Sequence, residues 1–311
     1  METEKQISGN FKQKLAEKAS CVEKILQKYL PAKGKAPAII EDAMNYSLLA
    51  GGKRLRPVFM VETYRLFSGE KEINAQLEAF LSAMEMIHTY SLVHDDLPAM
   101  DNDEYRRGRK TTWAVYGDAM GILAGDSLLN FAFETAAKAF DDCQDKEAYQ
   151  RVARAMKVLA ENAGIYGMIG GQVADVLAEK QGGNLSEEEI LYVHTHKTGA
   201  LIEASMLIGA ILAKAPEKTL EALSKCAMDI GVAFQIQDDI LDVTGDSKEL
   251  GKNVGSDAAN GKQTYVTIHG LEYAQKEVER LSEEAVQILK NLPGDSEFLE
   301  ELVEYLIHRR S

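Results

Sequence analysis

The sequence has few of the residues that a disulfide-stabilised or membrane-spanning fold requires. It contains only three cysteines in 311 residues, and their spacing fits neither a metal site nor a redox pair, so we expect a reducing compartment. The longest apolar run, residues 204–213, is too short to cross a bilayer. Residues 1–14 are polar and mixed in charge, without the pattern of a signal or transit peptide. These absences favour a cytoplasmic protein.

The chain also lacks an excess of positive charge and any strand pattern. The formal net charge is −14, which argues against a nucleic-acid partner because such a partner requires a basic face. No segment alternates Val, Ile or Thr between turn dipeptides, so neither strands nor hairpins are expected. No internal repeat, low-complexity tract or change of composition marks a second domain.

Helical periodicity is the pattern that is present. Apolar residues recur every three or four positions in four long segments, 78–93, 148–163, 190–212 and 220–243. Ser186 followed by Glu189 is a capping box that begins a helix, and Thr219 is expected to cap the next long one. The sequence therefore predicts one all-α domain over residues 1–311.

Two groups of aspartates interrupt these apolar helices. They are Asp95, Asp96 and Asp101, and Asp238, Asp239 and Asp242. An ionised carboxylate without a partner is costly to remove from water, so two such groups indicate a shared cation. Oxygen ligands without histidine or cysteine favour Mg²⁺, which usually completes its shell with water and substrate phosphate. We therefore expect a phosphorylated substrate.

The two aspartate groups differ in helical geometry. At 100° per residue, Gln235 and the second group fall on one stripe of a helix that is apolar nearly all round, where a solvated acidic face fits poorly. Asp95 and Asp101 would point to opposite sides of a continuous helix. A break at Pro98 would return Asp101 towards Asp95, and the alternative is a plain helix end followed by an acidic loop.

Two basic clusters accompany the aspartates. Residues 51–57 read Gly-Gly-Lys-Arg-Leu-Arg-Pro, and residues 106–110 read Arg-Arg-Gly-Arg-Lys. Glycine lets the backbone approach a phosphate closely, and arginine binds phosphate oxygens bidentately. A solvated face is the alternative for either cluster alone. Two cationic clusters beside two anionic ones predict a site for two phosphorylated groups and several metal ions.

Other features are weaker or misleading. The glycine-rich segment 244–264 carries Lys252 and Lys262 and is interpreted as a mobile lid; its partial matches to a Walker A loop have the wrong glycine spacing. Glu85 and His88 match one Glu-x-x-His element of di-iron bundles. No second copy of that element exists, so His88 is expected to bind phosphate or to be a core histidine.

Taken together, the motifs in residues 45–262 resemble those of trans-isoprenyl diphosphate synthases, and more narrowly bacterial farnesyl diphosphate synthases. The resemblance includes Lys-Thr-Gly at 197–199, where an interrupted helix would expose carbonyl groups. It implies a many-helix bundle around a deep central cavity, and a homodimer. It also implies head-to-tail condensation of isopentenyl diphosphate with dimethylallyl and geranyl diphosphate to give (2E,6E)-farnesyl diphosphate.

The resemblance further implies a role for each motif residue. The aspartates would hold three Mg²⁺ ions, or Mn²⁺ in their place. The residues expected to bind the allylic diphosphate are Arg106, Lys197 and Lys262. Those expected to bind isopentenyl diphosphate are Lys53, Arg56, His88 and Arg107. Lys197, Thr198 and Gln235 would place oxygen atoms near the developing cation, and Lys252 would close with the lid.

Tyr90 and Ser91 precede Asp95 on one helix and bear on product length. At about 1.5 Å per residue, Tyr90 lies roughly 7 Å beneath the metal site, where a chain of about two isoprene units would meet its ring. This favours a C15 product, unless Tyr90 is only a core aromatic. A geranylgeranyl diphosphate synthase and a non-catalytic partner subunit remain alternatives. A terpene cyclase is not expected to carry both basic clusters.

Overall fold

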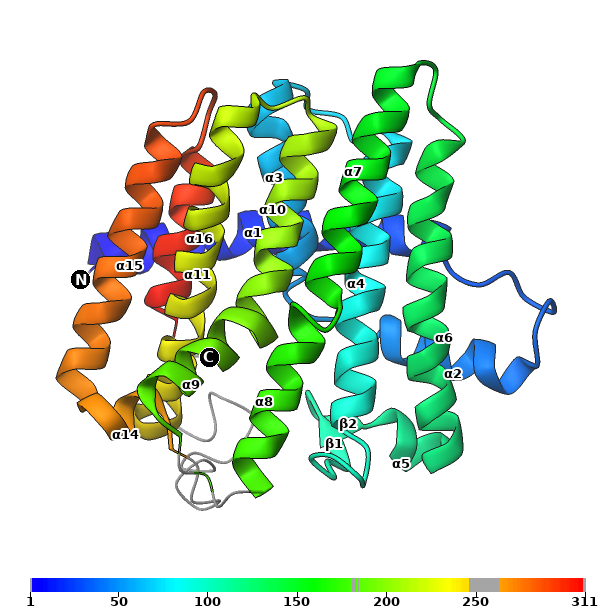
Figure 1. Cartoon of the computed structure of the whole chain (residues 1–311), viewed down its shortest axis with the longest axis horizontal. Helices are drawn as coiled ribbons and strands as arrows, with labels where there is room; N and C mark the ends of the chain where they lie inside the picture. The colour runs from blue at the N-terminus through cyan, green and yellow to red at the C-terminus, as the bar shows by residue number, and fades with distance from the viewer. Residues whose placement is uncertain (1, 181–182, 184, 246–262, 310–311) are drawn as a thin grey trace. The chain divides into compact units, whose positions relative to one another are not determined.

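Over the residues that it describes, the computed structural model is almost entirely helical, which confirms the all-α prediction (Figure 1). It describes residues 2–180, 183, 185–245 and 263–309. The helices are α1 (Glu2–Lys28), α2 (Ala38–Leu48), α3 (Leu55–Ser68), α4 (Ala75–Asp95), α5 (Thr112–Tyr116), α6 (Asp118–Ala137), η1 (Lys138–Phe140), α7 (Lys146–Ala163), α8 (Met168–Lys180), α9 (Glu187–Val193), η2 (His194–Gly199), α10 (Ala200–Leu212), α11 (Glu217–Thr244), α14 (Tyr265–His269), α15 (Leu271–Lys290) and α16 (Glu297–Ile307).

The chain divides into two compact units, and each is considered by itself. Unit 1 is Met1–Val61 with Glu70–Met156, and unit 2 is Glu62–Gly69 with Lys157–Ser311. The expectation of a single domain rests on uniform composition and stays a prediction. None of the described helices combines the length and the apolar character that a membrane crossing requires.

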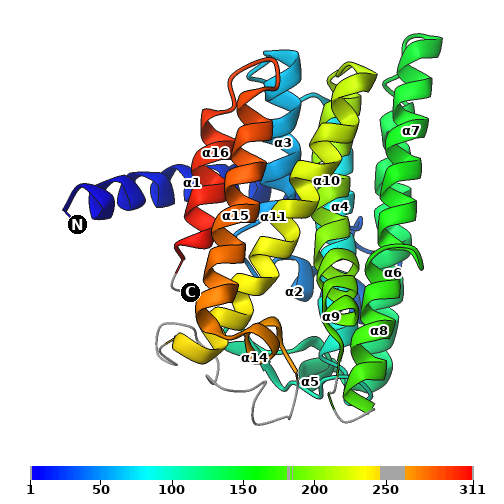
Figure 2. The ribbon, with the colours of Figure 1, turned by 60° about the vertical axis from the view of Figure 1, so that its left-hand side comes forward.

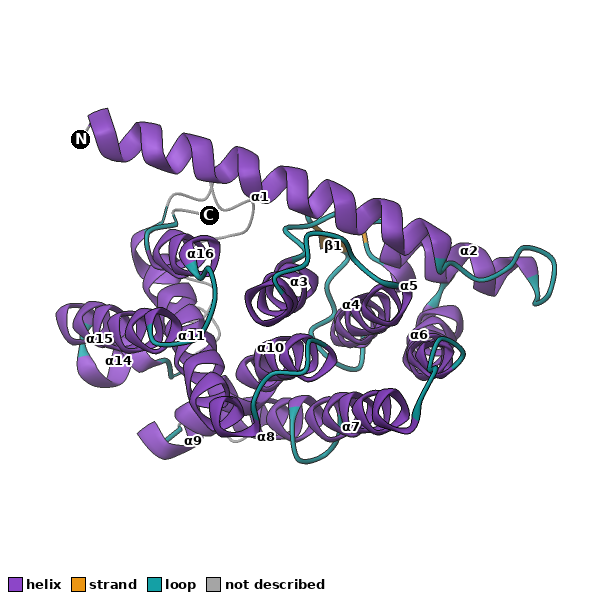
Figure 3. Cartoon of the chain, turned by 90° about the horizontal axis from the view of Figure 1, so that it is seen from above, coloured by secondary structure: helices purple, strands orange, loops and turns teal. Residues whose placement is uncertain are grey.

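In unit 1, α4 packs along α6, and the two helices are seen end-on side by side in Figure 3. The helix α4 begins where the Asn74 side chain accepts a hydrogen bond from the Leu77 N–H at 2.9 Å. Its middle is buried on every side, with Phe80 and Met84 fully enclosed. The small residue Gly121 on α6 lets that helix approach the turn after α4, because a Cβ there would lie 2.9 Å from Leu97 Cδ2.

In unit 2, α11 packs against α15 and α10, and α11, α15 and α16 run side by side in Figure 2. Ala233, Ile236 and Ile240 of α11 form a core cluster with residues of α15. The capping box at Ser186 and Glu189 is confirmed, since both reciprocal hydrogen bonds are present. The expectation for Thr219 is wrong: α11 begins at Glu217 after Pro216, and the Thr219 hydroxyl donates to the Pro216 carbonyl at 2.6 Å.

One short hairpin departs from the expectation that the chain has no strands. The strands β1 (Tyr105–Arg106) and β2 (Arg109–Lys110) pair antiparallel. Arg107 and Gly108 join them with φ of 53° and 76°, the positive values that a two-residue hairpin turn of type I′ requires. The sequence signal was missed because basic residues, rather than β-branched or aromatic ones, flank the Arg-Gly pair.

Candidate active site

The first aspartate group lies where α4 ends. The helix stops at Asp95, and the Asp101 N–H donates to the Asp95 carbonyl at 2.9 Å. The Asp103 N–H donates to the Asp96 carbonyl at 3.1 Å, so the chain doubles back after Pro98. The helix thus ends before Pro98 and an acidic turn follows it, which is the alternative reading of this sequence, and the turn returns the Asp101 backbone beside Asp95. Asp95 is buried at this turn and Asp101 is exposed.

The Asp96 carboxylate of this group has a perturbed pKa. It is 4% exposed and accepts a hydrogen bond from Arg106 Nε at 2.6 Å. Burial raises the pKa of Asp96 to about 6, and Arg106 offsets this only in part, because Asp103 and Asp101 add further negative charge.

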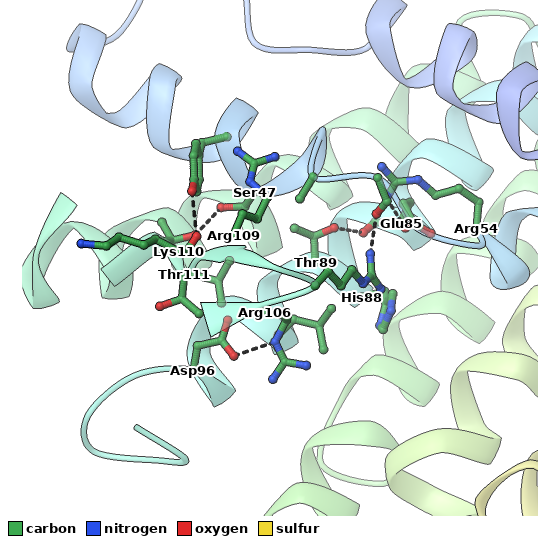
Figure 4. Close-up of a pocket in the computed structure, with 17 residues that line it drawn as sticks. Ser47, Arg54, Glu85, His88, Thr89, Asp96, Arg106, Arg109, Lys110 and Thr111 are labelled. Carbon is green, nitrogen blue, oxygen red and sulfur yellow. Dashed lines mark hydrogen bonds and ion pairs between the residues drawn. The ribbon is translucent and has the colours of Figure 1, made fainter. Parts of the chain in front are cut away.

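A pocket in unit 1 is lined by residues from both basic clusters (Figure 4). Its lining includes Arg54, His88, Asp96, Arg106, Arg107, Arg109 and Lys110. The helix α2 fixes the hairpin at one side, where the Tyr46 hydroxyl donates to the Lys110 carbonyl at 2.7 Å and the Tyr46 ring lies 4.0 Å from Arg109 Cζ. The rigid hairpin thereby presents several cations to one pocket.

Arg54 joins this pocket to the protein interior. It is 5% exposed, adopts a left-handed backbone conformation with φ of 49°, and donates to Glu85 Oε1 at 2.5 Å and to Glu23 Oε1 at 2.7 Å. Glu85 Oε2 is buried and has no hydrogen-bond partner among the described residues. A positive φ outside glycine is sparsely populated and tends to occur at functional sites. Arg54 therefore helps to fix the basic residues of the pocket, and the Glu85 carboxylate balances the charge of Arg54.

Arg56 and His88 form a partly buried pair in this site. Arg56 Nη1 lies 3.3 Å from His88 Nε2, while Arg56 Nε and His88 Nδ1 are buried without a partner in the described part of the chain. Burial and then the charge of Arg56 hold the pKa of His88 well below its usual value, so the imidazole is neutral. Burial also lowers the pKa of Arg56 to about 10. A bound anion would relieve both groups.

Arg107 links the two basic clusters directly. Its Nη1 donates to the Gly51 carbonyl, across 56 positions of sequence. A Cβ on Gly52 would lie 3.0 Å from Arg107 Cζ, and the φ of Gly52 is 138°. Gly52 thus permits the close approach of this arginine, whereas a Cβ on Gly51 would meet nothing within 4 Å. Lys53, beside it, is exposed.

The second aspartate group lies on α11 in unit 2. Asp238 Oδ1 accepts from Arg309 at 2.6 Å, and Gln235 Nε2 lies 3.3 Å from Asp238 Oδ2. Arg309 also donates to the Phe234 carbonyl at 3.0 Å and stacks on the Phe234 ring, with Cζ 3.7 Å from its centroid. The Asp238 side chain is 40% exposed, so it remains accessible from solvent.

Asp239 and Asp242 on the same stripe are more enclosed. Asp239 Oδ2 accepts the Tyr265 N–H at 3.0 Å and lies 3.7 Å from His194 Nε2. Asp239 therefore anchors the start of α14, and Asp242 is buried. The stripe is not a solvated acidic face.

The predicted helix interruption near residues 197–199 is confirmed. The segment η2 is a π-helix, a form that is rare and frequent at functional sites. Lys197 Nζ donates to Asp175 Oδ2 at 2.6 Å, and Thr198 is buried. Gly231 on α11 permits close contact, since a Cβ there would lie 2.5 Å from Gly199 Cα. Lys197, Thr198 and Gln235 thus belong to the same unit as the second aspartate group.

Some expectations cannot be followed further. Lys252, Lys262 and the interpreted lid at 246–262 lie outside the described residues. Among the residues that are described, no three Asp, Glu, His or Cys side chains converge into a closed metal cage. Mg²⁺ is usually held by one or two carboxylates and substrate phosphate rather than by such a cage, so the donor set still fits it.

Three partners of the site were not anticipated from the sequence. Asp175 holds Lys197, Glu85 holds Arg54, and Arg309 holds Asp238. In the sequence, Glu85 matches only one half of a di-iron element. Its ion pair with Arg54 argues against a role as an iron ligand. A single charged residue that is distant in sequence from its partner belongs to no local motif, so the sequence alone does not identify it.

Comparison with known proteins supports the resemblance of the motifs to those of trans-isoprenyl diphosphate synthases. The family model described as polyprenyl synthetase matches residues 37–306. The chain is 44% identical over 308 residues to a heterodimeric geranylgeranyl pyrophosphate synthase large subunit 1 of Arabidopsis thaliana, covering 98% of this chain and 81% of that one. It is 39% identical over 300 residues to a farnesyl diphosphate synthase of Geobacillus stearothermophilus, covering 96% and 98%.

Solved structures agree with the sequence relatives. An FPP/GFPP synthase of Zymomonas mobilis matches with a TM-score of 0.83 at 30% identity, covering 96% of this chain and 99% of that chain. A geranylgeranyl pyrophosphate synthetase of Pyrococcus horikoshii matches with a TM-score of 0.82 at 30% identity, covering 99% of each. By its motifs, its helical fold and these matches, the chain belongs to the polyprenyl synthetase family.

Proposed function

We propose that the protein condenses isopentenyl diphosphate with dimethylallyl and geranyl diphosphate to give (2E,6E)-farnesyl diphosphate. The observation that carries the proposal is the basic pocket of unit 1: its wall includes His88, and His88 and the neighbouring Arg56 keep buried nitrogens without partners among the described residues. Buried donors of this kind gain most from a highly charged anion. Lys53, Arg56, His88 and Arg107 would bind isopentenyl diphosphate there.

The aspartates are proposed to hold Mg²⁺, three ions in all, with Mn²⁺ as an alternative. When bound, the metal would stabilise the charge that develops on the departing diphosphate. Arg106 and Lys197 would bind that diphosphate, together with Lys262. Lys197, Thr198 and Gln235 would orient oxygen atoms towards the developing carbocation, and Lys252 would close over the site. Apolar helix faces around these residues would keep water from the cation.

Two further properties are proposed, the oligomeric state and the cellular location. A homodimer is supported by Ile122 and Leu123 on α6, each 47% exposed, since adjacent exposed apolar side chains favour association. Cytoplasmic location is supported by the sparse cysteines, although the Arabidopsis relative named above is called chloroplastic.

The proposal is tested by incubating the protein with isopentenyl diphosphate, dimethylallyl diphosphate and Mg²⁺ and sizing the products by chromatography. A C15 product is expected. A C20 product as the main species would favour a geranylgeranyl diphosphate synthase, in line with the name of the Arabidopsis relative. No product at all would favour a non-catalytic partner subunit.

Replacing Tyr90 with alanine is expected to lengthen the product beyond C15. Tyr90 is 5% exposed and lies on α4 five residues before Asp95, with Ser91 beside it, so its ring would end the space open to a growing chain. The measurement is the product profile of the variant. Tyr64→Ala, which also removes a buried ring (4% exposed), is the control and should keep the C15 product. An unchanged profile for Tyr90→Ala would contradict the assignment.

A further inference from the structure

The ring of Tyr90 is held in place by packing rather than by a hydrogen bond. Its hydroxyl is buried and has no hydrogen-bond partner among the described residues. Its ring meets the His94 ring one turn later on α4, edge to face, with centroids 5.9 Å apart and planes at 83°. Such aromatic pairs favour this geometry. The orientation of Tyr90 therefore depends on where His94 lies.

His94 is in turn fixed by α6. Its Nε2 lies 3.0 Å from the Ile122 carbonyl oxygen, and because that oxygen can only accept, Nε2 carries the proton. Asp126 Oδ1 lies 3.7 Å from the same nitrogen and favours a proton there. The ring of His94 thus contacts its own helix at Tyr90 and the neighbouring helix at Ile122.

Gly125 makes this arrangement sterically available. A Cβ at Gly125 would lie 2.8 Å from His94 Cε1 and closer still to Nε2 and Cδ2. Carbon atoms do not normally approach a ring so closely, so any larger residue must displace His94. Gly121, one turn earlier on α6, is less crowded and faces other residues, because a Cβ there would lie 2.9 Å from Leu97 Cδ2 and 3.0 Å from Trp113 Cβ. The two glycines therefore serve different contacts.

We propose that His94 and Gly125 are positioning residues that set product length through Tyr90. In this arrangement α6 determines where the His94 ring lies, and that ring determines where Tyr90 stops the growing chain. The inference rests on the proposed function, in which Tyr90 limits the product to C15. It adds that Tyr90 is insufficient unless α6 keeps a glycine at position 125.

The test is the ratio of C20 to C15 products of Gly125→Ala and of the matched control Gly121→Ala. Gly125→Ala is expected to raise the ratio about tenfold, because it removes one aromatic contact and one hydrogen bond that orient Tyr90. Gly121→Ala adds the same methyl group to the same helix and should leave the ratio at the wild-type value. A wild-type ratio for Gly125→Ala, or an equal rise for Gly121→Ala, would overturn the proposal.

His94→Ala keeps the test valid if Gly125→Ala fails to fold. It also shows whether the change in product length acts through the His94 ring. It removes the ring without crowding α6, and the C20 to C15 ratio should rise as for Gly125→Ala. In a Tyr90→Ala background, His94→Ala should change the ratio no further, since both act through one ring. Independent, additive effects would overturn the positioning role. If Tyr90→Ala itself fails to lengthen the product, the chain-length part of the proposed function fails too; if only His94→Ala fails, that function stands.

Discussion

Replacing Asp238 with asparagine is expected to lower kcat by about 10²–10³-fold, as losses of preorganised charge stabilisation do. Asparagine keeps the shape of the side chain, and its Oδ1 can still accept from Arg309. It loses the negative charge that would hold a divalent cation beside the departing diphosphate. The Asp238 side chain is 40% exposed, but its partner Arg309 is 3% exposed, so loss of the carboxylate charge leaves a buried guanidinium less compensated and the unfolding midpoint should also fall.

The control for Asp238→Asn is Asp229→Asn, on the same helix. Asp229 pairs with Lys225 at 2.7 Å, and its replacement makes the same change in net charge. Steady-state kinetics at several Mg²⁺ concentrations, with calorimetric titration of Mg²⁺ in the presence of inorganic diphosphate, measure both effects. Asp238→Asn should weaken Mg²⁺ binding, and Asp229→Asn should not. Equal losses for the two variants would show that α11 responds to charge in general rather than at Asp238.

Replacing Arg54 with methionine is expected to destabilise the protein by about 3–5 kcal/mol, the cost of leaving one member of a buried ion pair without its partner. The side chains of Arg54 and Glu85 are 2% and 4% exposed, and methionine would leave the Glu85 charge buried. The free energy of unfolding in urea measures the effect. Glu85→Leu in the Arg54→Met background should restore most of it, because the uncompensated charge is then gone.

Arg280→Met is the matched control for Arg54→Met. Arg280 also contacts two carboxylates, Glu277 and Glu284, but its side chain is 51% exposed. Exposed ion pairs contribute about 0–1 kcal/mol, so the control should lose no more than that. If Arg280→Met lost as much stability as Arg54→Met, burial would not be the source of the effect.

The helices and the aspartate geometry could be predicted because they depend on local pattern. Pro98 disfavours a continuous helix, so a helix boundary near it could be expected, and α4 ends at Asp95 just before it. The partners of the site could not be predicted in the same way. Arg309 and Asp238 are 71 positions apart, and Arg54 and Glu85 are 31 apart. Such pairs are set by how the helices pack, which no short motif encodes.

The hydrogen bond between Arg107 and Gly51 has a consequence for exchanging segments between relatives of this protein. The segments 51–57 and 106–110 are separate in sequence, yet the Gly51 carbonyl of the first accepts a hydrogen bond from the Arg107 side chain of the second. A chimera that imports the first segment with any residue other than glycine at position 52 would push Arg107 out of place. The two segments therefore act as one structural unit. A chimera keeps the pocket only when the two proteins that supply the segments both have the contact between Arg107 and the glycines at 51 and 52.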